Sequence, residues 1–347
     1  MIKRNVNLLI FVLIITLSSC WSNTKVDSNR DLGPLKIIFE TDIGNDVDDA
    51  LALDMIYKYL DTDKIDLLGI MINKEGEYPV IYTDIMNTWY GYPDIPIGVV
   101  RNGANSEHDA VNFAKCVALL QNDLGEPMFN RSGVDYTKVP EAHDLYREIL
   151  SKQPDSSVVI ISVGFSTNLA RLLETTADEF SPLNGKELVA KKVKYLSNMA
   201  GSFNNPDHYE YNVAKDIDAA KKVFEEWPTN IIISPFEVGI QINYPATSIK
   251  NDFEWAPHHP MVEAYKCYLE MPYDRPTWDL TSVLYAVEGS SFFDVSPSGE
   301  VTVRDEGSTS FKSDVNGKHK YLMVDSAQSN NIKQHFINLV SKRPLNK

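Results

Sequence analysis

The sequence contains few of the features that nucleic-acid-binding, membrane-spanning or disulfide-rich proteins need. Its 347 residues include 33 Lys and Arg against 48 Asp and Glu, which gives a formal net charge of −15. A chain this acidic lacks the basic face that binds nucleic acid or an anionic membrane. Three cysteines are too few for a disulfide scaffold, and the sequence leaves open whether Cys116 and Cys267 pair. The chain also contains no Gly-x-Ser-x-Gly nucleophile turn and no P-loop.

The first 34 residues have the pattern of an export signal followed by a tether. Two basic residues precede the apolar stretch Leu8 to Leu17, which is too short to span a bilayer. Leu17-Ser18-Ser19-Cys20 follows and resembles a bacterial lipobox. We therefore expect a signal peptide over residues 1–19, a lipid on Cys20 and a flexible tether over residues 20–34. The protein would be exported to the cell envelope and contact the membrane only through this anchor. The alternative is an ordinary signal peptide in which Cys20 is incidental.

Residues 35–347 alternate between strand-like and helix-like segments, without repeats or an internal linker. Apolar strand candidates lie at Lys36–Phe39, Asp66–Ile72, Ile95–Val100, Ser157–Val163, Val193–Met199 and Asn230–Ser234. Helix candidates lie at Asp48–Leu60, Val80–Tyr90, Asn112–Leu120, Glu141–Lys152, Thr167–Glu174, Asp216–Glu226, Met261–Leu269, Leu280–Val287 and Asn331–Leu339. This alternation predicts a single α/β domain with a doubly wound, mostly parallel central sheet flanked by helices. Near the end of the chain, period-two alternation from Phe292 to Val303 predicts a hairpin.

Five carboxylates gather where the first predicted strand ends. They are Glu40, Asp42, Asp46, Asp48 and Asp49, and no cation lies among them. Open α/β sheets place their ligands at the carboxyl ends of strands. Like charges this close raise each other's pKa, and a hard divalent cation with oxygen ligands relieves the repulsion. The segment therefore predicts a metal or catalytic site rather than a solvated acidic turn that caps a helix.

Two other sites could use such acids. An EF-hand loop counted from Asp42 needs Gly at its sixth and Glu at its twelfth position, but Val47 and Leu53 stand there. The register that starts at Asp46 fails in the same way. A phosphatase that forms an aspartyl phosphate needs an Asp where Glu40 stands. The sequence weakens this magnesium-dependent phosphatase hypothesis and leaves it open.

The acid cluster resembles the N-terminal signature of the inosine-uridine nucleoside hydrolase family, in its longer form with an additional Asp before the Asp pair. Four later segments resemble this family in the same order. They are Gly164–Ala170 (the family's Gly-Pro-Leu-Thr-Asn-Leu-Ala turn), Asn198–Gly201 (Met-Gly-Gly), Glu210–Ala220 (Glu-Phe-Asn-x-x-x-Asp-x-x-Ala-Ala) and Arg275–Leu280 (the returning metal Asp). Taken alone, each has a plain structural explanation, such as a helix N-cap or a core Met.

The resemblance implies calcium-dependent hydrolysis of the N-glycosidic bond of ribonucleosides. It implies that Ca2+ is held by Asp42, Asp49, the backbone carbonyl of Thr167 and Asp279, with Asp42 as general base. The residues it implies around the sugar are Asp48, Asn73, Met199, Asn204 (or Asn205), Glu210 and Asn212. If residues 210–212 are extended, Glu210 and Asn212 point the same way and can grip neighbouring hydroxyls. The substrate would be a small nucleoside, and we expect a homo-oligomer.

One position departs from the family pattern. Many members have a His before the returning Asp that is tied to protonation of the leaving base, whereas this chain has Trp278 before Asp279. Purine-preferring members can carry Trp here and stack it on the base, so the resemblance favours a purine preference. An indole cannot protonate a ring nitrogen that it stacks upon. Trp278 could equally be a core residue, and His208 is either a spare acid or a loop residue without a role. A surface protein that binds nucleosides or sugars without catalysis is the third hypothesis.

Overall fold

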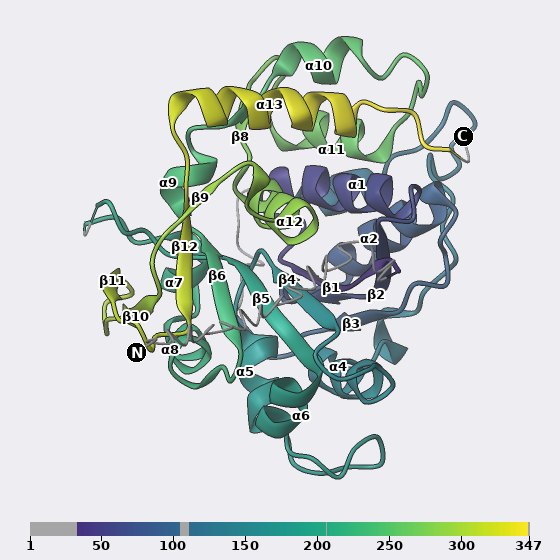
Figure 1. Cartoon of the computed structure of the whole chain (residues 1–347). Coiled ribbons are helices and arrows are strands. Elements are labelled where there is room, and N and C mark those ends of the chain that lie inside the picture. Colours follow the sequence, from purple (N-terminus) through teal and green to yellow (C-terminus); the bar gives the residue numbers. More distant parts are fainter. Residues whose placement is uncertain (1–32, 105–110, 206, 346–347) are drawn as a thin grey trace, which may run out of the picture. The chain divides into compact units, whose positions relative to one another are not determined.

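A ten-stranded sheet forms the centre of the computed structural model, which describes residues 33–104, 111–205 and 207–345 (Figure 1). Its parallel strands, in spatial order, are β12 (His319–Met323), β6 (Asn230–Ser234), β5 (Val193–Met199), β4 (Val158–Ser162), β1 (Leu35–Thr41), β2 (Ile65–Ile72) and β3 (Ile97–Val99). The antiparallel strands at one side are β10 (Gly299–Val303), β11 (Thr309–Ser313) and β9 (Asp294–Val295). The predicted α/β class and mostly parallel sheet are confirmed.

Helices cover both faces of this sheet, because side chains alternate along each strand. In β1, Ile37 and Phe39 pack in one core and Ile38 packs in the other. The first face carries α1 (Asp48–Leu60), α2 (Glu77–Tyr90), α3 (Phe113–Ala118), α11 (Pro260–Tyr268), α12 (Trp278–Glu288) and α13 (Ser326–Val340). The second face carries α4 (Ala142–Ser151), α5 (Thr167–Glu174), α6 (Gly185–Lys192) and α8 (Ile217–Glu226) (Figure 1).

Shorter elements lie around the ends of the strands. They are α7 (Tyr211–Lys215), α9 (Phe236–Gly239), α10 (Ala246–Asn251), and the small antiparallel pair β7 (Asn243–Tyr244) and β8 (Arg275–Pro276). The chain runs from β1 to β2 and β3 in one direction and then returns to place β4 on the other side of β1. Such a reversal opens a crevice at the carboxyl ends of the two strands, where doubly wound folds bind ligands. Here β1 and β4 end at that crevice.

The predicted hairpin over Phe292–Val303 is wrong. β9 pairs with β12, and β10 pairs with β11 and β12, so the two predicted arms do not pair with each other. Ser296, between the arms, exchanges hydrogen bonds with Tyr321 of β12, the strand to which β9 pairs. The period-two pattern indicated strands correctly, but their partners come from later in the chain.

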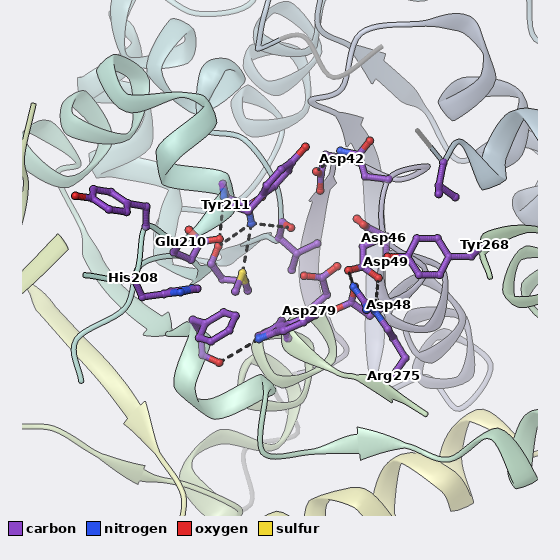
Figure 2. A pocket seen from close by; sticks show the side chains of 18 residues that line it. Asp42, Asp46, Asp48, Asp49, His208, Glu210, Tyr211, Tyr268, Arg275 and Asp279 are labelled. Carbon is purple, nitrogen blue, oxygen red and sulfur yellow. Dashed lines mark hydrogen bonds and ion pairs between the residues drawn. The ribbon is translucent and has the colours of Figure 1, made fainter. Parts of the chain in front are cut away.

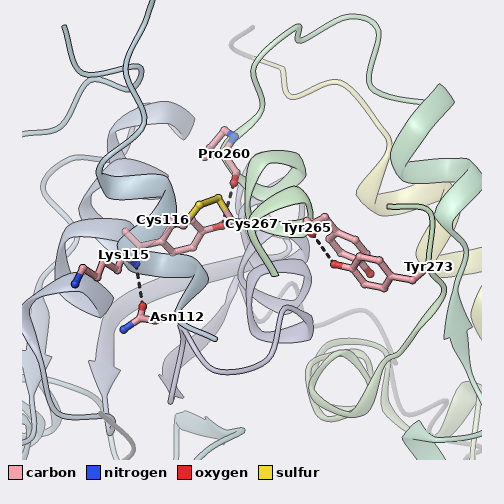
Figure 3. The surroundings of a disulfide bond; sticks show 8 residues. Asn112, Lys115, Cys116, Pro260, Tyr265, Cys267 and Tyr273 are labelled. Atoms are coloured by element: carbon pink, nitrogen blue, oxygen red, sulfur yellow. Dashed lines mark hydrogen bonds between the residues drawn. A yellow bond between two sulfur atoms is a disulfide. The ribbon is translucent and has the colours of Figure 1, made fainter. Parts of the chain in front are cut away.

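A disulfide joins Cys116 in α3 to Cys267 in α11 (Figure 3). The bond links two segments that border the crevice, since Val111 before α3 and Tyr268 at the end of α11 both reach it. The predicted signal peptide (1–19), Cys20 and all of the tether (20–34) except Gly33 and Pro34 lie outside the described residues. Among the helices that the structure describes, none is both long and apolar enough to cross a membrane.

Candidate active site

A cavity of about 450 Å³ lies at the carboxyl ends of β1, β4 and β5. Its walls come from the loop after β1, the segment that leads into α7, α9, the end of α11 and the start of α12. Figure 2 shows two groups of side chains facing each other across it. His208, Glu210 and Tyr211 lie on one side, and Asp46, Asp49, Tyr268 and Arg275 lie on the other.

Three carboxylates form a cluster on the wall of this cavity. Asp48 and Asp49 belong to the first turn of α1 and Asp279 to the first turn of α12, and each offers an oxygen within 4.8 Å of the others. All three are at most 4% exposed. The backbone N–H of Asp279 donates to Asp48 Oδ2 (3.2 Å), and the Thr41 hydroxyl donates to Asp49.

The electrostatics of this cluster fit a divalent cation. Burial, and then repulsion by the neighbouring acids, raises the pKa of Asp48, Asp49 and Asp279 well above the usual range. A hard cation with oxygen ligands would remove the repulsion among these three buried carboxylates. This cluster therefore fits the metal site that the sequence analysis expected at Asp49 and Asp279. Asp48 belongs to the same cluster.

Asp42 lies beside this cluster, one residue after β1, and lines the cavity. Asn45 donates to its Oδ2 (2.9 Å). Burial raises the pKa of Asp42 to about 6, although the charge of Lys74 acts in the opposite direction. A carboxylate with such a pKa accepts a proton more readily near neutrality than an ordinary Asp. Gly164, at the end of β4, permits this packing, because a Cβ there would lie 2.6 Å from the Asp42 backbone nitrogen.

Glu210, Asn212 and Met199 line the cavity, and residues 210–212 are not extended. Glu210 is the N-cap of α7, and Asn212 already belongs to that helix. The Glu210 carboxylate accepts the backbone N–H groups of Gly201 (3.0 Å), Asn212 (2.8 Å) and Val213 (3.1 Å). Burial nevertheless raises the pKa of Glu210 to about 7. The two polar side chains thus reach the cavity from a capped helix start rather than from an extended segment.

Trp278 also lines the cavity, and its edge is fixed to the protein. The indole Nε1–H donates to the carbonyl of Phe236 (3.0 Å), and the two rings stack at 5.5 Å between centroids. Gly239 makes room for this arrangement, because a Cβ there would lie 2.4 Å from the Trp278 Cα. Trp278 therefore packs partly in the core and partly lines the cavity, and its indole N–H is hydrogen-bonded to the protein.

Three predicted site residues are not part of the cavity wall. Thr167 begins α5, and its hydroxyl donates to Asp216 (2.7 Å). Its predicted ligand atom is the backbone carbonyl, and that role stays a prediction. Asn73 is buried behind Asp42, close to Gly164, and donates to Glu40 (3.1 Å). Asn204 is exposed and donates its backbone N–H to Glu237 (3.1 Å). The sugar contacts predicted for Asn73 and Asn204 also stay predictions.

Several residues that line the cavity were not predicted from the sequence. Arg275 pairs with Asp46, with Nε 2.8 Å from Oδ1, and its guanidinium lies over the rings of Tyr268 (5.1 Å) and Trp278 (5.3 Å). The sequence offered one signal, since Arg275 opens a segment that resembles the family. Nothing in the sequence indicated Tyr268, Phe236 or Val111, which tertiary packing brings to the cavity.

The model of the inosine-uridine preferring nucleoside hydrolase family matches residues 37–335. The chain belongs to this family. It is an N-glycosyl hydrolase of a family that acts on small nucleosides. The family is metal-dependent, and this chain has a cluster of three buried acids that could hold a metal. Glu40, at the position where a phosphatase would need its nucleophile, is fully buried, receives the Tyr146 hydroxyl and does not line the cavity.

Solved structures of nucleoside hydrolases share the fold. An inosine-uridine preferring nucleoside hydrolase from Bacillus anthracis is 17% identical, with a TM-score of 0.64, over 88% of this chain and 99% of that one. A purine-preferring ribonucleoside hydrolase from Gardnerella vaginalis is 18% identical, with a TM-score of 0.64, over 88% and 98%. A plant nucleoside hydrolase is also 18% identical, with a TM-score of 0.64, over 89% and 98%. A comparison with curated protein sequences gave no match.

Proposed function

We propose that this nucleoside hydrolase uses calcium to release free base and ribose, and that it prefers purine nucleosides. The observation that carries the proposal is the juxtaposition of Asp42 with the buried trio Asp48, Asp49 and Asp279, opposite Glu210 in one cavity (Figure 2). Negative charge on one wall suits a cation that binds sugar hydroxyls. Hydrogen-bonding groups on the other wall suit the rest of the ribose.

Calcium fits the site better than a soft transition metal, because the available ligands are carboxylate oxygens. Asp42, Asp49 and Asp279, with the Thr167 carbonyl, would hold it, and Asp48 would bind a sugar hydroxyl from the same cluster. A bound calcium ion would supply positive charge that orients the ribose diol and lowers the pKa of a water molecule.

The chain's own groups account for the remaining chemistry. Asp42 accepts the proton of the attacking water, whose oxygen forms a bond to the sugar's anomeric carbon as the bond to the base breaks. Glu210 and Asn212 hold hydroxyls of the ribose. The backbone N–H groups that already bind Glu210 hold that carboxylate in one position. The face of Trp278 that lines the cavity would stack on the base, and the broad indole face favours the larger purine.

The proposal is tested with the purified protein and a panel of ribonucleosides. We expect calcium-stimulated release of reducing sugar, faster from inosine and guanosine than from uridine and cytidine. Release of phosphate from phosphate esters would favour the phosphatase hypothesis instead. Binding of nucleosides without any sugar release would favour the non-catalytic surface protein.

We also propose that the protein is exported and held at the cell envelope through a lipid on Cys20. The disulfide between Cys116 and Cys267 supports this placement, because disulfides persist in oxidising compartments outside the cytoplasm. We propose in addition that the chain forms a homo-oligomer. This assembly is tested by the mass of the purified protein in light scattering, and a monomer at working concentrations would contradict it.

A further inference from the structure

Two donors beside the metal cluster, Trp278 and Arg275, already have partners. The indole N–H of Trp278 donates to the Phe236 carbonyl, and the Arg275 guanidinium is paired with Asp46. The indole N–H is engaged and a guanidinium is not deprotonated in proteins, so neither residue gives a proton to a departing base. A purine leaves poorly as an anion, so hydrolysis at the proposed site needs a proton from another group.

His208 has the properties of such a donor. It lines the cavity, and its Nε2 is shielded from solvent yet has no hydrogen-bond partner among the described residues. Buried polar atoms in folded proteins are nearly always hydrogen-bonded, so an unpartnered one in a cavity wall points to a ligand. The rest of the residue is fixed, because its backbone N–H donates to Asn205 (3.1 Å) and its ring packs on Phe236 at 3.8 Å between centroids.

The position of this ring suits a role on the base. The rings of His208 and Trp278 pack against the same Phe236 side chain, so the three form an aromatic row along the cavity. Figure 2 shows His208 beside Glu210, across the cavity from Asp46, Asp49 and Arg275. A group that protonates the leaving base must lie away from the group that activates the water, since the two act on opposite faces of the sugar.

We propose that His208 donates the proton that the leaving purine requires, a role that rests on the proposed nucleoside hydrolysis. As the bond between the anomeric carbon and the base breaks, its electron pair goes to the base. The His208 imidazolium gives its Nε2 proton to a ring nitrogen of the base and becomes a neutral imidazole. The water oxygen bonds to the anomeric carbon, and its proton goes to Asp42. Solvent then returns a proton to His208 and removes one from Asp42.

Tyr268 is a weaker candidate. Burial raises the pKa of Tyr268 to about 12, so its phenol can hydrogen-bond but is a poor source of protons near neutrality. Tyr268 also lies on the side of Asp46 and Arg275 (Figure 2). His258 does not line this cavity and its side chain is 61% exposed, which makes it a suitable histidine control.

The test compares two substrates that differ only in the leaving group. Inosine needs its base protonated, whereas 4-nitrophenyl riboside releases a stable phenolate without help. In His208→Gln we expect turnover of inosine to fall by about 100-fold or more, the lower range for general acid catalysis. Turnover of the nitrophenyl riboside should change by less than about threefold on the same reasoning. The control His258→Gln, the same substitution at a histidine outside the cavity, should leave both substrates unchanged.

Other outcomes would overturn the inference. Equal losses on both substrates would make His208 a residue that shapes the pocket, and no loss on either would make it an inert loop residue. If His208→Gln does not fold, His208→Ala with an unchanged melting temperature serves for the same comparison. A wild-type protein that hydrolyses neither riboside would refute the proposed function itself. A wild type that hydrolyses both, with an unselective His208 variant, would refute only the role of His208.

Discussion

Asp46 and Arg275 form an ion pair that joins the loop after β1 to strand β8, across 229 residues of sequence. This ion pair is a structural role for Asp46, the additional Asp of the longer family signature. The positive charge of Arg275 lowers the pKa of Asp48, whereas the negative charge of Asp46 raises it. Pairing with Arg275 therefore keeps Asp46 from adding to the repulsion within the metal cluster. The same guanidinium lies over Tyr268 and Trp278, which links the metal side of the cavity to the proposed base site.

Arg275→Gln should therefore expose the charge of Asp46 to the cluster. We expect the metal-free variant to melt at a lower temperature than the wild type and to gain more from calcium, because the cation now neutralises one more acid. The double variant Asp46→Asn, Arg275→Gln should regain most of the metal-free stability. Thermal melts with chelator and with calcium measure both effects. Additive effects of the two substitutions would show that the pair is not coupled.

Asp42→Asn should abolish most of the activity without unfolding the protein. The amide keeps the shape and the contact with Asn45 but cannot take a proton from water. We expect turnover of inosine to fall by at least about 100-fold, the lower range for general base catalysis. Steady-state sugar release measures the loss, and circular dichroism checks the fold. Near-normal turnover would remove Asp42 as the base.

Calcium should stabilise the protein more as the pH rises. Burial raises the pKa of Asp42 to about 6 and that of Glu40 to about 8, above their unfolded values. In the metal-free protein their contribution to stability is therefore fully present below pH ~4 and is lost as the pH rises to ~8. Calcium binds the ionised form of Asp42, so the calcium-induced rise in melting temperature should grow through pH ~6. Melting curves at several pH values test this, and a chelator-insensitive melting temperature at every pH would argue against a bound metal.

Trp278→Ala should lower kcat/KM for purine nucleosides more than for pyrimidine nucleosides. Base–aromatic stacking contributes about 1–3 kcal/mol, so we expect kcat/KM for inosine to fall by roughly 5- to 150-fold. The loss for uridine should be smaller, because a pyrimidine covers less of the indole. Kinetics on the two nucleosides give the comparison. Equal losses would indicate that Trp278 only supports the wall, and no loss would make it a core residue.

Cys20→Ala should release the protein from membranes or block its maturation, because the thiol would carry the lipid. Fractionation of cells that express the two forms measures this. A Cys116→Ser variant is a matched control, since it removes a different thiol and leaves the N-terminal segment intact. Identical partitioning of the wild type and Cys20→Ala would dismiss the lipid anchor.

The sequence predicted those parts of the site that lie in short, ordered segments. Asp42, Asp48 and Asp49 follow a buried strand, and Asp279 opens a helix, so a strand–loop–helix argument and a family resemblance were enough to find them. Phe236 and Tyr268 could not be found in this way. Their place in the cavity depends on how α9 and α11 pack, which local pattern does not encode.

The error in the predicted hairpin has the same origin. The strand pattern near Gly299 was correct, but its partners β11 and β12 lie further along the chain, and pairing between distant segments leaves no local signal. Helix α6 escaped prediction although its capping box, Asn184 with Glu187, was visible in the sequence. The last helix begins at Ser326, five residues before the predicted start at Asn331. A similar capping box, Asp325 with Gln328, precedes it.

The disulfide between Cys116 and Cys267 determines what a proteolytic cut does to the protein. The two cysteines are 151 residues apart, and the covalent loop that they close contains β4, β5, β6 and the segment with Glu210 and Asn212. Surface loops are the usual sites of proteolytic cleavage. A single cut within this loop would leave the two fragments joined, so the strands that carry the two walls of the cavity could not diffuse apart. An enzyme nicked there would still migrate as one chain on a non-reducing gel and as two fragments after reduction.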